Sequence, residues 1–178
     1  MKKVLLGIAA VFALSAVNAQ SGKNQLGIGA EVGIPTESGS KAGFGGSLKY
    51  MHGVGTAGQV TLSAGALVQS DKEDILGTEY KTTVTTIPIL LGYRHYFSGF
   101  FIEPQAGYVS TKGKVKGGGD DFSASEGSFG YAFGLGYAME QGLDLGVKYL
   151  NVAESGAKGL IVFRVAWNIN LGGASSSK

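Results

Sequence analysis

The sequence predicts an all-β fold, namely an eight-stranded antiparallel up-and-down transmembrane β-barrel, and three observations support this prediction. Apolar and polar residues alternate with period two in eight separate blocks. Glycine supplies 31 of the 178 residues, and within the blocks it falls almost entirely on the less apolar face. Short and long connections between the blocks alternate along the chain, which is typical of transmembrane barrels.

Each block is predicted to be one strand, because its apolar residues recur at every second position and clusters of Gly, Ser, Asp or Lys bound it. In the first block Leu26, Ile28 and Val32 alternate with glycines and one glutamate. In the last block Phe163 and Trp167 belong to an alternating series of the same kind. The eight blocks, in chain order, are 26–34, 43–50, 59–68, 87–94, 102–108, 129–138, 143–149 and 161–169.

Two turns predict how neighbouring strands pair. A two-residue hairpin loop at 98–99 would set Arg94 opposite Glu103, so that opposite charges face each other. A three-residue loop at 140–142, with its glycine in the left-handed region, would set Phe133 opposite Tyr149. Both pairings match the character of the facing side chains and therefore support antiparallel hairpins.

Pro88 and Pro104 lie inside two of the predicted strands. Proline removes a ladder hydrogen bond, and a closed barrel has no edge strand to accommodate it, so we expect a local bulge at each position.

Alternation alone leaves open whether the apolar face lies inside, as in a soluble barrel, or outside, as in a membrane barrel. The glycine distribution favours an outward apolar face, because glycine weakens a strand and adds no stabilising contact on a water-facing surface. In a narrow lumen, by contrast, glycine leaves room for long charged side chains. We therefore predict a packed polar lumen, whose buried charges need partners and form a network of Glu31, Lys49, Arg94, Glu103, Asp144, Lys148 and Arg164.

The connections indicate which end of the barrel is which. The short ones are 51–55, 96–99 and 139–142, and the longer, polar ones are 69–79, 111–126 and 152–158. Short turns face the periplasm in such barrels and long loops face the outside, so both termini should be periplasmic. Aromatic residues near the short turns predict an interfacial girdle of Tyr50, Tyr96, Phe97, Phe100, Phe101, Tyr137 and Trp167.

The first 19 residues are predicted to be a signal peptide. Two lysines precede an apolar run over 4–17, and small residues ending at Ala19 suit cleavage. A membrane-spanning helix is the alternative, but the run is shorter than the ~20 residues that cross a bilayer. The predicted organisation is thus a signal peptide at 1–19, a barrel domain at 20–171 and a short polar tail at 172–178.

Composition excludes several functions. The chain contains no cysteine and its formal charge is only +2, so thiol chemistry, disulfides and nucleic-acid binding are not expected. The only two histidines, His52 and His95, fall beside short turns on the predicted periplasmic side, which does not suit a lipid-modifying enzyme of the outer leaflet. We predict no enzymatic activity, no cofactor and no metal site.

The segments 86–97 and 101–108 carry a family resemblance. They look like the central hairpin of porin-like barrels common in Bacteroidetes, and the chain resembles the small eight-stranded outer-membrane β-barrels, which include the transmembrane domain of outer-membrane protein A and outer-membrane protein X. One departure is Leu171, which stands where family members often end on an aromatic residue.

The resemblance implies an outer-membrane protein that supports the membrane or interacts at the cell surface through its loops. Its expected partners are outer-membrane lipid and lipopolysaccharide, the barrel-assembly machinery and an unknown extracellular loop partner. A monomer is expected, because closure removes the sheet edges that invite pairing. Two alternatives stay open: a narrow porin-like channel or small-solute carrier, and a soluble exported lipocalin-like barrel that binds an apolar ligand.

Overall fold

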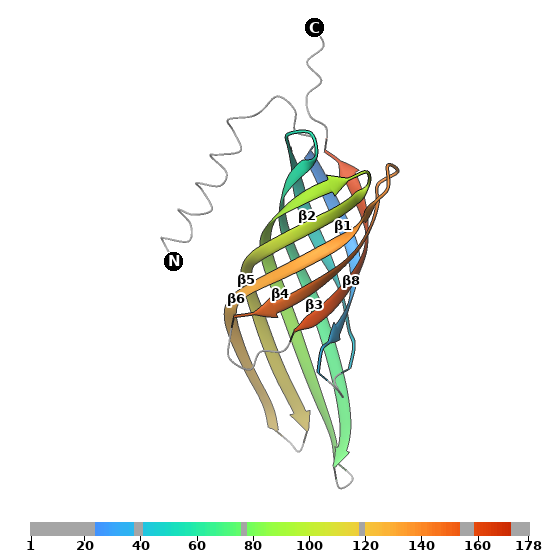
Figure 1. The fold of residues 1–178 in the computed structure, drawn as a ribbon. Coiled ribbons are helices and arrows are strands. Elements are labelled where there is room, and N and C mark those ends of the chain that lie inside the picture. Colours follow the sequence, from blue (N-terminus) through green and yellow to red (C-terminus); the bar gives the residue numbers. More distant parts are fainter. Residues whose placement is uncertain (1–23, 38–40, 76–77, 118–119, 154–158, 172–178) are drawn as a thin grey trace.

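The computed structural model describes residues 24–37, 41–75, 78–117, 120–153 and 159–171, so the predicted signal peptide at 1–19 and the tail at 172–178 lie outside the described residues. Eight strands form one closed antiparallel barrel in which each strand pairs with its sequence neighbours and β8 pairs with β1 (Figure 1). The strands are β1 (Asn24–Pro35), β2 (Gly43–Val54), β3 (Gly58–Ile75), β4 (Thr78–Phe97), β5 (Phe100–Gly117), β6 (Asp120–Ala138), β7 (Leu143–Val152) and β8 (Leu160–Asn170). The predicted fold class is confirmed. The described part of the chain contains no helix that is long and apolar enough to cross a membrane.

Both predicted turns are present. Phe97 pairs with Phe100 across a two-residue loop whose Ser98 and Gly99 have φ values of 52° and 92°, as a type I′ turn requires. Gly142 closes the β6–β7 loop with φ 105°, and the predicted pairing of Phe133 with Tyr149 follows from it.

The bulges predicted at Pro88 and Pro104 are absent. The β4–β5 register runs unchanged through Pro88, with Ile89 opposite Tyr108, and the β5–β6 register runs unchanged through Pro104. A bulge would add a residue to one strand and shift the register by one. Instead, the β3–β4 ladder passes from Ala64↔Ile89 to Leu67↔Thr86 without a shift. The barrel accommodates each proline within an unshifted ladder, so this prediction was wrong.

Two of the predicted long loops are mostly strand. The segments 69–79 and 111–126 belong to two hairpins, β3–β4 and β5–β6, whose strands pair out to Ile75↔Thr78 and Gly117↔Asp120. One cause is visible in residues 81–86, where threonine and valine, which favour extended backbone, occupy five of the six positions. These hairpins extend from the end of the barrel opposite the short turns and the two described ends of the chain (Figure 1). The third predicted long loop, 152–158, lies mostly outside the described residues.

The apolar face of the sheet points outward, as the glycine distribution predicted. Leu48 and Phe163 are about half exposed, at 52% and 48%, whereas Arg94 is 1% exposed. Glycine makes room in the lumen: a Cβ atom on Gly27 would lie 2.6 Å from Oδ1 of Asn168, and one on Gly92 would lie 2.8 Å from Cγ of Gln105. Gly27 and Gly92 thus leave space that inward polar side chains fill.

The lumen is polar over only part of its length. An apolar layer lies between the buried charged residues and the long hairpins. It consists of Leu90, Val109, Ala132 and Leu150. Beyond this layer, at the barrel mouth, a cavity of about 480 Å³ opens between the hairpins. The prediction of a polar lumen therefore holds for the part near the short turns. An apolar layer follows, and inward residues beyond it, such as Gln69, Asp71 and Thr86, are polar again at the mouth.

Candidate functional site: the charged cluster in the lumen

Glu103 on β5 is the centre of the polar half of the lumen. Its carboxylate accepts hydrogen bonds from Lys49 Nζ on β2 at 2.8 and 2.9 Å, and from Arg94 Nε and Nη2 on β4 at 3.0 and 2.8 Å. Thr61 Oγ1 and Gln105 Nε2 donate to the same carboxylate, each at 2.8 Å. Because the donors come from β2, β3, β4 and β5, this carboxylate connects four neighbouring strands through the lumen.

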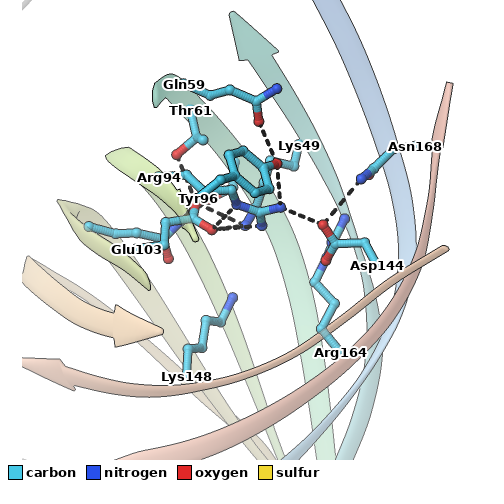
Figure 2. Close-up of polar contacts among 12 residues, drawn as sticks. Lys49, Gln59, Thr61, Arg94, Tyr96, Glu103, Asp144, Lys148, Arg164 and Asn168 are labelled. Atoms are coloured by element: carbon cyan, nitrogen blue, oxygen red, sulfur yellow. Dashed lines mark hydrogen bonds and ion pairs between the residues drawn. The ribbon is translucent and has the colours of Figure 1, made fainter. Parts of the chain in front are cut away.

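Arg94 connects this group to a second carboxylate. Its Nη1 donates to Oδ2 of Asp144 on β7, so that the guanidinium lies between Glu103 and Asp144 (Figure 2). Asp144 also accepts hydrogen bonds from Arg164 Nη1 at 3.2 Å and Asn168 Nδ2 at 3.1 Å. The contacts therefore run from β2 through β4 and β5 to β7 and β8.

Glu31 on β1 adds a third carboxylate. Lys148 Nζ lies 3.2 Å and Arg164 Nε 3.8 Å from Oε1 of Glu31. Glu31 Oε2 and Arg164 Nη2 are buried without a hydrogen-bond partner in the described part of the chain, and a buried water could satisfy such atoms. With this carboxylate, all seven residues of the predicted network lie in one cluster, which holds four cations and three carboxylates.

Two residues predicted for the aromatic girdle lie in the lumen instead. Phe101 is 4% exposed and its ring centroid is 3.6 Å from Cζ of Arg94, a cation–π contact. Tyr96 Oη donates to Gln59 Oε1 at 2.8 Å and lies 3.4 Å from Nη1 of Arg94. The assignment of these two residues was wrong because they share the parity of the inward residues Arg94 and Glu103. The other five predicted girdle residues are exposed on the outer face: Tyr50, Phe97, Phe100, Tyr137 and Trp167.

Sequence reasoning missed the uncharged polar members of the cluster. Thr61, Gln105 and Asn168 are buried and bond to its carboxylates. Their parity is the available signal, since each alternates with outward apolar residues on its strand. Their individual partners depend on which strands face each other across the lumen, and the sequence does not give that arrangement directly.

The two histidines do not form a catalytic arrangement. His52 Nδ1 lies 2.7 Å from Asn24 Oδ1, and the His95 ring lies between those of Tyr93 and Phe97. Among the described residues, no three His, Cys, Asp or Glu side chains gather in a way that could hold a metal ion. The cluster is thus an arrangement of paired opposite charges, with one more cation than carboxylates, that occupies the lumen.

The comparisons with known proteins agree with this architecture. The model of the outer membrane protein beta-barrel domain matches residues 6–172. The chain belongs to this family of outer-membrane proteins. No curated protein matches the chain.

Several solved structures share the fold. Ail of Yersinia pestis, in complex with the heparin analogue sucrose octasulfate, is similar with a TM-score of 0.63 and 17% identity, covering 84% of this chain and 100% of that one. The N-terminal barrel domain of Pseudomonas aeruginosa OprF is similar with a TM-score of 0.57 and 14% identity, covering 84% of this chain and 100% of that one. Neisserial surface protein A is similar with a TM-score of 0.54 and 14% identity, covering 83% of this chain and 97% of that one. At these identities the likeness concerns the fold.

Proposed function

We propose that this family member is a non-enzymatic, non-conducting outer-membrane barrel that supports the membrane and presents two long hairpins for interaction at the cell surface. The barrel would act as a monomer, since closure leaves no free strand edge for pairing. Insertion would depend on the barrel-assembly machinery, even though Leu171 replaces the usual terminal aromatic residue.

The observation that carries this proposal is the difference in strand length. β1, β2, β7 and β8 have 10 to 12 residues, close to the ~9–11 residues that cross a membrane. β3, β4, β5 and β6 have 18 to 20. At ~3.3 Å per residue, the excess of about eight residues carries the two hairpins roughly 25 Å further along the strand direction.

The filled lumen supports the absence of conduction. Buried charges from β1, β2, β4, β5, β7 and β8 meet in the cluster, and the apolar layer around Leu90 and Val109 follows it along the barrel axis. Barrels of about eight strands enclose a space that side chains fill. The alternative of a narrow channel or small-solute carrier is tested in a planar lipid bilayer, where we expect no conductance steps from the refolded mature protein. Reproducible steps from the purified barrel would overturn the non-conducting assignment.

The two proposed roles can be separated by shortening one hairpin. Residues 113–124 can be replaced by Asn-Gly, because Lys112 and Ser125 are paired at the base of the excised segment and Asn-Gly favours a tight hairpin turn. Cells lacking the protein are complemented with either form. We expect the shortened barrel to restore resistance to detergent, which measures membrane support.

The same pair of proteins tests the surface role. Sucrose octasulfate is the first probe, because Ail, which has a similar barrel fold, was crystallised with it. We expect binding to the full-length protein and loss of binding in the shortened one. Equal binding by both forms would show that the β5–β6 hairpin is not the interaction surface.

A further inference from the structure

The outer face of the long hairpins carries lysines just beyond the lipid-facing band. On β5, Phe100, Ile102 and Tyr108 point outward and are exposed. Lys112, Lys114 and Lys116 share their parity and continue the same outward face. Lys112 lies four residues past Tyr108, or about 13 Å along the strand. These ammonium groups therefore lie at the height of lipid head groups and beyond, on the side that faces the surrounding membrane.

Hydroxyl groups flank the two lysines nearest the membrane. Lys112 is paired with Thr85 on β4 and Ser125 on β6, and Lys114 with Thr83 and Ser123. Paired residues on neighbouring strands point to the same face of a sheet, so these rows place ammonium and hydroxyl donors side by side. Neither β4–β5–β6 row contains an acidic residue.

The next row toward the hairpin tips places like charges opposite each other. Lys81 pairs with Lys116 across β4 and β5, and Lys72 occupies the register position opposite Lys81 on β3. Like charges directly opposite destabilise a sheet. Asp121 completes this row in the register, and the paired Asp74 and Glu79 lie two register positions further toward the tip. Along the outward-parity rows of β4, β5 and β6, the lysines therefore come first from the membrane, and Asp121 is the first acidic residue in the register.

We propose that this lateral basic face, formed by Lys81, Lys112, Lys114 and Lys116 with the hydroxyls of Thr83, Thr85, Ser123 and Ser125, binds phosphate groups of lipids in the outer leaflet. The face points sideways from the barrel wall, toward neighbouring lipids, whereas a soluble partner would meet the hairpin tips first. Lys114 and Lys116 also interact within the protein, and an ammonium group has three N–H donors with which it can serve a further acceptor. This inference goes beyond the proposed function, because it depends neither on a closed lumen nor on a soluble surface partner.

The test measures lipid binding in phosphate-free micelles. The mature protein is refolded in octyl glucoside, and diphosphoryl lipid A in the same micelles is titrated into it in a calorimeter. Each lysine near an anionic surface contributes to the free energy of binding. Because the double variant K112Q/K114Q loses two such contributions, it should bind lipid A about thirty-fold more weakly. The control K41Q makes the same change at the lumen mouth, where Lys41 pairs with Asp71, and should bind within about twofold of the wild type. K112R/K114R should retain binding, because it retains the charge. Faster migration of unboiled samples on a gel shows that each variant is folded.

Two results would overturn the proposal. In the first, K112Q/K114Q binds lipid A as tightly as K41Q does, so that the lateral lysines have no part in lipid binding. In the second, sucrose octasulfate binds in a way that depends on Lys112 and Lys114 while lipid A does not, which would assign the face to a soluble polyanion. A conducting barrel in the bilayer experiment would leave this inference unaffected, so the non-conducting assignment and this inference fail independently.

Discussion

Removing the Glu103 carboxylate should destabilise the barrel more than any change of a surface charge. In Glu103→Ala, six hydrogen bonds from Lys49, Thr61, Arg94 and Gln105 are lost. Arg94 keeps Asp144 as a partner, but Lys49, which is 5% exposed, loses the carboxylate that it contacts. Breaking a buried ion pair from one side costs about 3–5 kcal/mol, so we expect a loss of about 4 kcal/mol in the free energy of unfolding.

The assay is urea unfolding of the protein refolded into detergent or lipid vesicles, followed by the fluorescence of Trp167, the only tryptophan. The free energy is taken from linear extrapolation at equal slope. Glu140→Ala is the matched control, because Glu140 is exposed in the β6–β7 turn and its removal should cost less than about 0.5 kcal/mol.

A double variant separates the free-energy cost of breaking the ion pair from the cost of lost packing. Lys49→Met combined with Glu103→Gln removes both charges, so its cost should be smaller than the sum of the two single costs by at least about 1 kcal/mol. A Glu103→Ala variant within about 1 kcal/mol of Glu140→Ala would refute the reasoning, because a buried, uncompensated ammonium cannot be that inexpensive.

Three further predictions use the same unfolding assay. Asp144→Asn should cost about 3 kcal/mol, because it weakens the contacts of both arginines at that carboxylate; no change would mean that Asp144 is not ionised in the lumen. Gly92→Val should cost about 2 kcal/mol by overpacking, whereas Gly113→Val should be nearly neutral because a Cβ there meets nothing within 4 Å; equal effects would contradict a filled lumen. Phe101→Leu should cost about 1–2 kcal/mol by removing the ring beneath Arg94, and a stabilised variant would exclude that contact as favourable.

The alternation and the turns were sufficient to predict the barrel topology and much of the register. A two-residue loop at Ser98–Gly99 permits one antiparallel alignment, and the period of two then assigns each following side chain to a face. Glycine decided which face is inside, because lumen space is limited by opposing side chains such as Arg164 beside Gly27. The inward positions of Lys49, Arg94 and Glu103 follow from these two rules.

Other features depend on interactions that local sequence does not contain. Aromatic type suggested an interfacial role for Tyr96 and Phe101, but parity places them inward, where Arg94 offers a cation for the Phe101 ring and a polar contact for Tyr96. Polar composition indicates loops at 69–79 and 111–126, but continued pairing between neighbouring strands satisfies backbone hydrogen bonds that a loop would leave to water. The apolar layer at Leu90 was missed because its members come from four strands.

The most direct test of the account asks whether the apolar face meets lipid. Trp167 is 53% exposed on the outer face, two residues from Val165, which is 55% exposed. In vesicles of phosphatidylcholine brominated along the acyl chains, the account predicts strong quenching of Trp167 fluorescence and little quenching by iodide in the water. Quenching by iodide together with full fluorescence in brominated lipid would place this face in water and contradict a membrane barrel.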